Sequence, residues 1–142
     1  MRKIEAQTIK AVRDLLWNPT FEGRYWRAGN MQVEQNHIGV HGTANYERQI
    51  AVKLHGHEIF TLCPDDGYIH LSDCGYQTRT TKSRLNVLLG CFTDGFYIFQ
   101  KNFEWMFSAT RWDKSEEWSG SLGTTFRLNS DNYLLRQAEM LA

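Results

Sequence analysis

Residues 73 to 90 read Asp73-Cys74-Gly75-Tyr76-Gln77-Thr78-Arg79-Thr80-Thr81-Lys82-Ser83-Arg84-Leu85-Asn86-Val87-Leu88-Leu89-Gly90. Three of these leucines recur at the i, i+3, i+4 spacing that gathers apolar side chains on one face of a helix, namely Leu85, Leu88 and Leu89. A threonine hydroxyl accepts a hydrogen bond from the first helical turn, so we expect Thr80 or Thr81 to be the N-cap. Gly90 is expected to end the helix in the left-handed conformation. The stretch therefore predicts a strand end, a basic loop and a short helix.

The basic residues of this stretch are Arg79, Lys82 and Arg84, and no acidic residue follows Asp73 within it. All three lie near the expected helix start, where free backbone N–H groups favour anions. One interpretation is a phosphate-binding loop. The other is that the basic side chains are solvated or pair with acidic residues elsewhere. Because both interpretations treat them as surface charges, replacing all three with Ala is expected to leave the fold intact.

Composition narrows the class of protein. A chain of 142 residues is expected to form a single domain, residues 1–142. Its formal net charge is zero, so no overall field recruits nucleic acid or an acidic membrane. The three cysteines have no recognised spacing, and no signal peptide or long apolar run is present. We expect a soluble cytoplasmic protein without a membrane partner.

The remaining sequence alternates helical and strand patterns. Residues 2–17 form an amphipathic helix that Asn18-Pro19 ends, and Ser130 is expected to cap a terminal helix. Alternating apolar residues and turn signals predict strands at 31–33, 46–54, 58–62, 68–72, 96–100, 103–107 and 124–128. The expected class is α+β: a single antiparallel sheet with a short central helix, and with N- and C-terminal helices packed on it.

Aromatic residues make up 13% of the chain, and two groups of them are candidates for contacts. The first lies in a segment expected to be irregular, residues 21–30, and consists of Arg24, Tyr25, Trp26 and Arg27. Such residues stack on bases and grip phosphates, but they also make cation–π covers over a core edge. The second is the hairpin 96–107, which carries rings on both faces. Either helices cover both faces, or one ring-bearing face is buried in a partner or a symmetric copy. We expect the two terminal helices to pack on the sheet and also a modest homodimer contact through this hairpin or the loop 112–118.

Catalytic and metal chemistry have little support. His37 and His41, and likewise His70 and Cys74, are spaced i, i+4, but none of these pairs lies on an expected helix. Cys74 near His70 is the one nucleophile worth naming, and such a pair arises readily by chance. We expect no catalytic residues, no metal and no cofactor, and therefore a protein that is not an enzyme.

A set of short motifs resembles small tailed-bacteriophage proteins. Their pattern is a Leu-His-Gly turn followed by Gly-Tyr-x-Thr-x-Thr-Thr-x-x-Arg-Leu-Asn, which here is Leu54-His55-Gly56 and residues 75–86. The resemblance covers residues 30–107. It implies expression in the cytoplasm of an infected bacterium, where small phage proteins bind nucleic acid, host polymerase or defence enzymes, and it implies no particular activity.

Two functions follow. The first is an accessory protein that binds a host protein, for example a defence or transcription component, and inhibits or redirects it. A neutral chain favours this reading, because sequence-independent nucleic-acid binding draws on many phosphate contacts. The alternative is nucleic-acid binding through two groups of residues: the helix-cap loop with Arg79, Lys82 and Arg84, and the cluster Arg24, Tyr25, Trp26 and Arg27.

Overall fold

The computed structural model describes residues 1–17, 23–39, 47–64, 67–93, 96–102, 104–108, 117–119 and 125–127. The described helices are α1 (Lys3–Trp17) and α2 (Arg79–Phe92). The described strands are β1 (Gly23–Ala28), β2 (Met31–Ile38), β3 (Glu47–Leu54), β4 (His57–Cys63), β5 (Tyr68–Leu71), β6 (Tyr97–Lys101), β7 (Glu104–Ser108), β8 (Glu117–Ser119) and β9 (Thr125–Arg127).

The strands form two antiparallel sheets. The larger has the order β1-β2-β3-β4-β5-β9, and the smaller has the order β6-β7-β8. The α+β class with antiparallel sheet is therefore confirmed, whereas the expectation that all strands join a single sheet is wrong. The reason is that β9 pairs with the outer edge of β5, so β6 cannot add there. Instead, β6 is attached to α2, because Asn86 of α2 is hydrogen-bonded to the backbone of Ile98 in β6.

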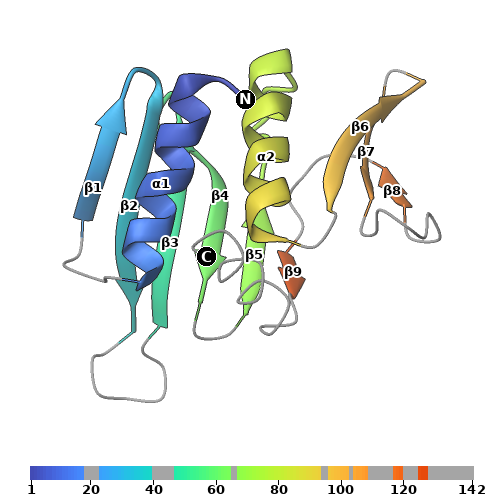
Figure 1. The fold of residues 1–142 in the computed structure, drawn as a ribbon. Helices are drawn as coiled ribbons and strands as arrows, with labels where there is room; N and C mark the ends of the chain where they lie inside the picture. Colours follow the sequence, from blue (N-terminus) through green and yellow to red (C-terminus); the bar gives the residue numbers. More distant parts are fainter. Residues whose placement is uncertain are drawn as a thin grey trace.

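Both described helices lie on the same face of the six-stranded sheet, α1 over β2 and β3 and α2 over β4 and β5 (Figure 1). This agrees with the expected packing of the N-terminal helix and of the central helix. Paired strands supply a row of buried residues beneath the helices, including Val33, Val52, Phe60 and Leu71. The helices cover that row with Val12 and Leu15 from α1 and with Leu85, Leu88, Leu89 and Phe92 from α2. The expected C-terminal helix lies outside the described residues.

The ends of α2 differ from the expected ones. Its N-cap is Thr78, whose hydroxyl accepts a hydrogen bond from the Thr81 N–H at 3.1 Å, so Thr80 and Thr81 lie inside the helix. Gly90 does not end it, because the buried face continues to Phe92 and makes another turn favourable. The N–H of Thr93 then closes the helix on the Leu89 carbonyl at 2.9 Å.

Residues 23–28 form strand β1 and not part of the expected irregular segment. β1 pairs with β2 from Gly23 to Ala28, with a register shift between Arg24 and Trp26, and Trp26 lies opposite Val33. Gly29, at a φ of 55°, makes the tight turn between them. β2 also runs further than expected, to Ile38.

Candidate binding site

Three connections meet at one end of the six-stranded sheet: the β1–β2 turn, the β3–β4 turn and the β5–α2 loop. Both described helices also begin at this end (Figure 1). The His55 N–H donates to the Asn30 carbonyl at 2.8 Å and so joins the two turns. A Cβ added to Gly29 would lie 3.1 Å from Ile4 Cδ1, so the β1–β2 turn packs closely on the start of α1.

A pocket of about 410 Å³ opens between the β3–β4 turn and the β5–α2 loop. We call it the sheet-end pocket; it is lined by Leu54, His55, His57, Ile59, Asp73, Cys74, Tyr76, Thr78, Thr80 and Thr81. Its apolar part comes from the buried residues Leu54 and Ile59. Imidazoles and threonine hydroxyls supply the polar part. A pocket of this size and composition suits one large side chain or a small ring system.

The β5–α2 loop is held in shape by the buried Asp73. One carboxylate oxygen accepts from the Gly75 N–H at 2.8 Å, and the other accepts from Gln77 Nε2 at 3.0 Å. Cys74 and Gly75 both have positive φ, 52° and 83°, which turns the chain sharply. The Cys74 thiol donates to the Glu58 carbonyl at 3.1 Å and fixes the loop to β4.

This turn leaves Tyr76 at the rim of the sheet-end pocket. Its side chain is 55% exposed, and its ring centroid lies 5.2 Å from that of His57. The two rings therefore form a wall of the pocket that water can reach. Burying this wall against a partner would remove a large apolar surface from water.

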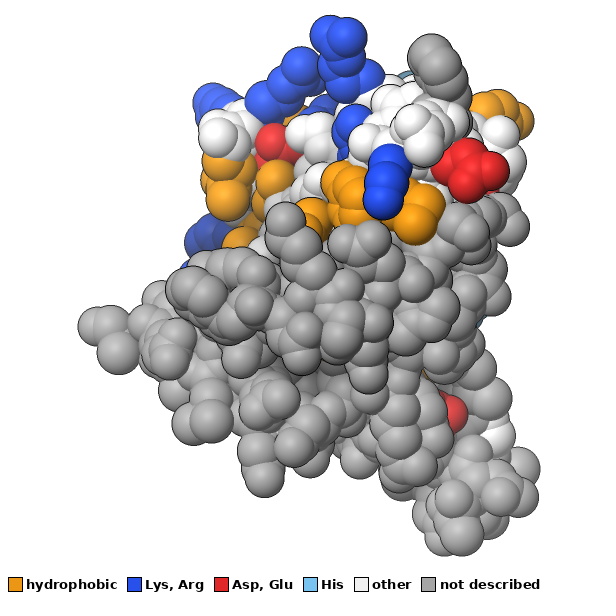
Figure 2. Space-filling model, turned by 90° about the vertical axis from the view of Figure 1, so that its right-hand side faces the viewer, with side chains coloured by type: hydrophobic (Ala, Val, Ile, Leu, Met, Phe, Trp, Pro, Cys, Tyr) orange, Lys and Arg blue, Asp and Glu red, His pale blue; other side chains and the backbone are white. Residues whose placement is uncertain are grey.

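Two of the predicted basic residues, Arg79 and Lys82, lie in the first turn of α2 beside this pocket. Arg79 is exposed and Lys82 is half-buried. That turn contains no acidic residue. Lys and Arg side chains gather at the top of the face drawn in Figure 2, the end at which both helices start.

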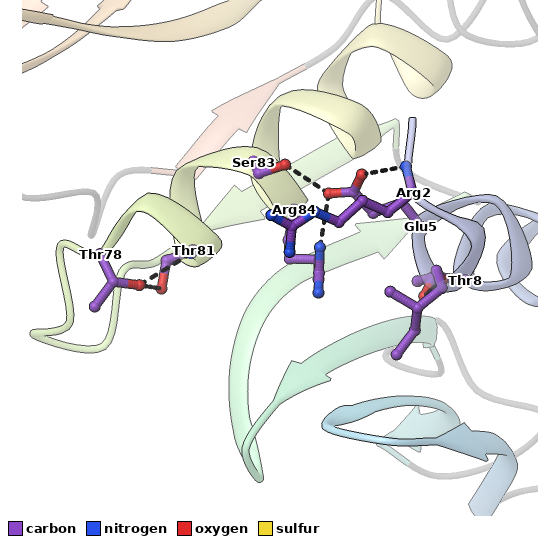
Figure 3. A network of polar contacts seen from close by, with 8 residues as sticks. Arg2, Glu5, Thr8, Thr78, Thr81, Ser83 and Arg84 are labelled. Carbon is purple, nitrogen blue, oxygen red and sulfur yellow. Dashed lines mark hydrogen bonds and ion pairs between the residues drawn. The ribbon is translucent and has the colours of Figure 1, made fainter.

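The third predicted residue, Arg84, lies in the interior. It is 5% exposed, and its Nη1 contacts a carboxylate oxygen of Glu5 at 2.8 Å (Figure 3). The Ser83 hydroxyl donates to that same oxygen at 2.7 Å, and the Arg2 backbone N–H donates to the other oxygen at 3.0 Å. Arg84 therefore joins α2 to α1 and is not a surface charge. The expectation that all three are surface charges is therefore wrong for Arg84, and we now expect their joint removal to destabilise the fold.

The Glu5 carboxyl responds to two opposed effects. Burial by itself would raise its pKa. The hydrogen bonds from Ser83, the Arg2 N–H and Arg84, together with the charge of Arg84, outweigh burial and lower the pKa of Glu5 below its ordinary value. Glu5 is thus held as a carboxylate inside the protein.

The cluster on β1 is divided between two places. Tyr25 and Trp26 pack partly against the core and border a hollow of about 480 Å³ beside α1, which agrees with the covering role. Arg27 is exposed and borders a different hollow, of about 490 Å³, which also touches Asn30 and His55. Of Arg24 only the backbone, in β1, is described.

The β6–β7 hairpin has one buried side. Ile98 and Trp105 belong to the core of this chain. Tyr97 and Phe99, on the other side, are half-buried and contact each other at 5.6 Å between ring centroids. A homodimer contact there stays a prediction, and residues 112–116 of the other expected contact lie outside the described part.

Within the described ranges, no group of His, Cys, Asp and Glu side chains is arranged to hold a metal ion. The three cysteines, all of them described, are present as thiols without disulfides. Cys74 has its Sγ on the Glu58 carbonyl and lies in the sheet-end pocket.

The sheet-end pocket itself was missed by sequence reasoning, although a signal for it was present. The phage-type motif has two halves, Leu54-His55-Gly56 and residues 75–86. Both contribute to the same pocket, through His55, Tyr76 and Thr80 among others. The recurrence of both halves together could have indicated that they lie side by side.

Comparison with known proteins places the chain among bacteriophage proteins. The family model described as Kyanoviridae Gp96 protein matches residues 1–127, and the chain belongs to this family. The match reaches beyond residues 30–107 at both ends. No curated protein and no solved structure gives a significant match. None of the described helices is both long and apolar enough to span a membrane.

Proposed function

We propose that this phage protein acts by binding a host protein, which it inhibits or redirects, and that it docks through the sheet-end pocket. The observation that carries the proposal is Tyr76, 55% exposed at the rim of a pocket lined partly by Leu54 and Ile59. Aromatic residues next to a pocket are typical anchors of protein interfaces. The zero net charge of the chain also favours a specific protein contact over generic binding to nucleic acid.

Preorganisation of the pocket supports the same proposal. The hydrogen bonds of Asp73 and Cys74 hold the β5–α2 loop by contacts within the chain itself. A partner that docks on an ordered loop loses less conformational entropy than one that must order it. The pocket therefore has the properties of a binding surface and not of a hinge.

Site-specific photo-crosslinking tests the proposal. A photoreactive residue placed at position 76 should capture a discrete host protein in host lysate, and nuclease should not change the product. Position 17 is the matched control, because Trp17 is 48% exposed and lies at the other end of α1. An excess of the unmodified protein should compete, whereas the Tyr76→Ala variant should not. Identical products from positions 76 and 17, or equal competition by Tyr76→Ala, would contradict docking at this pocket.

Nucleic-acid binding is the second candidate, favoured by the cations Arg27, Arg79 and Lys82 at the sheet end. If the protein binds nucleic acid, the product crosslinked at position 76 should be sensitive to nuclease. Short oligonucleotides should also bind with an affinity that falls as salt rises. The absence of a mobility shift at low salt with single- and double-stranded DNA and RNA would exclude it.

A further inference from the structure

A second hollow adjoins the sheet-end pocket, since His55 borders both. The second hollow, of about 490 Å³, also touches Arg27, Asn30 and Gly56. Together the two hollows offer more room than one side chain fills. A short extended segment of a partner would fit across them, with one side chain inserted in the sheet-end pocket.

Cationic side chains gather at this end of the sheet. Arg79 and Lys82 lie in the first turn of α2, whose threonines line the pocket, and Arg27 borders the second hollow. Lys3 is the first residue of α1, and Arg2 precedes it. The two helix starts are joined directly, because Glu5 of α1 accepts a hydrogen bond from Ser83 of α2 at 2.7 Å. The cations of α1 therefore lie close to those of α2.

The acidic residues of this end do not cancel that charge. Among the described residues they are Glu5, Glu58 and Asp73. Glu5 is neutralised by Arg84, whereas Asp73 keeps its charge but is buried, with both oxygens accepting hydrogen bonds within the loop. The acidic charges that remain, Asp73 and Glu58, are fewer than the cations Arg2, Lys3, Arg27, Arg79 and Lys82. Glu58 is the exposed one, and its carboxylate bonds the Thr61 hydroxyl. The sheet end is thus locally positive on a chain whose net charge is zero.

The cations of α2 are placed where they cost stability. The N-terminus of a helix carries a partial positive charge, which disfavours Lys and Arg in the first turn. Arg79 and Lys82 lie there without any acidic residue in that turn. Residues that oppose a local stability rule often serve function. Binding an anionic group would remove the repulsion.

Resting on the function proposed above, we infer that the docking segment of the host protein is an acidic peptide stretch with one apolar or aromatic anchor residue. The anchor enters the sheet-end pocket beside Tyr76. Its flanking carboxylates pair with Arg79 and Lys82 on one side and with Arg27 on the other.

Nucleic acid fits the same surface less well. The pocket has Leu54 and Ile59 in its lining, which cannot read the polar edges of a base. A single strand is usually bound by several stacking rings in succession. Tyr25 and Trp26 do not extend such a series, because they border the hollow beside α1. One anchor and a charged rim are instead typical of peptide recognition.

Selection from a random peptide display library on the full-length protein tests the inference. Peptides that combine Asp or Glu with one large apolar residue should be enriched on the parent protein and lost on Tyr76→Ala. Enrichment of basic peptides, or the same peptides on Tyr76→Ala, would overturn it. If no peptide is enriched and a single-stranded oligonucleotide binds at this surface, the inference is also overturned, in favour of nucleic acid.

Fluorescence anisotropy with the best selected peptide then separates charge from anchor. Replacing its Glu and Asp with Gln and Asn, or reversing Arg79 and Lys82 to Glu, should each weaken binding about tenfold. Lys101→Glu is the matched control, since Lys101 is an exposed cation on β6, and it should leave the affinity unchanged. Unchanged affinity after the Arg79 and Lys82 reversal would overturn the inference, provided that a thermal melt shows the variant folded.

The inference and the proposed function fail in different ways. If position 76 captures a host protein but the selected peptides are not acidic, the proposed function stands and the inference is wrong. If acidic peptides bind the pocket but position 76 captures no host protein, the chemistry of the surface is as inferred and the proposed function is wrong.

Discussion

The first and second turns of α2 contain the same kinds of residue in opposite surroundings. Arg79 in the first turn is exposed beside the sheet-end pocket, whereas Arg84 in the second is 5% exposed and paired with Glu5. On an ideal helix these two positions point about 140° apart. The phage-type motif therefore joins residues that face a partner with residues that hold the fold. An arginine within it has no assignable function until its neighbours in space are known.

Of the changes predicted for α2, removal of Arg84 should lower the stability of the fold most. If it does not, the contrast between the two turns is wrong. Arg84→Ala leaves the Glu5 carboxylate buried without its cation and is expected to destabilise the fold by about 3–5 kcal/mol. Arg79→Ala should change stability by less than about 0.5 kcal/mol. Urea denaturation measures both, and similar midpoints for the two variants would contradict the contrast.

A double variant is the control for the first prediction. In Glu5→Leu with Arg84→Met, apolar residues replace both charges, and most of the lost stability should return. If the double variant is as unstable as Arg84→Ala, the loss comes from packing and not from the unpaired charge.

Local pattern predicted much of the fold. β3, β4, β5 and the β6–β7 hairpin follow from residues that alternate with period two between recognisable turns. The helix start was missed because Thr78, Thr80 and Thr81 are equally good caps by type. Only the extended backbone of Thr78 decides among them. The division into two sheets depends on contacts between segments far apart in the chain, which short-range periodicity cannot reveal.

The site was less predictable, for a related reason. The role of Arg84 depends on Glu5, which is 79 positions away and has no local pattern that marks it. The basic side chains Arg79 and Lys82 were correctly placed at a helix start. The sheet-end pocket and the hollow beside Arg27 could not be predicted, because they depend on the β1–β2 and β3–β4 turns lying side by side.

Asn86 sharpens the comparison, because it is a further residue of the second turn of α2, besides Ser83 and Arg84, that makes a long-range contact. Its Nδ2 donates to the Ile98 carbonyl at 2.9 Å, and its Oδ1 accepts the Ile98 N–H at 2.6 Å. Asn86→Ala leaves both backbone groups unsatisfied and should cost about 1–3 kcal/mol. Hydrogen exchange at the Ile98 amide should accelerate. Gln100→Ala, an exposed change on the same strand, should leave that exchange rate unchanged.

Lowering the pH should weaken the contact between Glu5 and the second turn of α2, whereas the first turn has no such contact to an acidic residue within it. Because the folded-state pKa of Glu5 is lowered, its ionised form stabilises the fold above its ordinary pKa of 4.5. That stability is lost as the pH falls through the lower, folded-state pKa. Denaturation midpoints between neutral and acidic pH should therefore decline less in the Glu5→Leu, Arg84→Met variant than in the parent. Parallel profiles would contradict a stabilising Glu5 carboxylate.

The smallest expected effect concerns the first turn and has the opposite sign. Arg79→Glu places an acid at the positive end of the α2 dipole, where it should stabilise the fold by about 0.3–1 kcal/mol at low salt. The same change should weaken an acidic partner segment, so stability and binding move in opposite directions. Lys101→Glu, away from any helix end, should alter neither. Thermal melts at low and high salt, paired with peptide binding, measure both properties. If Arg79→Glu lowered stability, Arg79 would have a structural partner as Arg84 does, and the contrast between the two turns would fail.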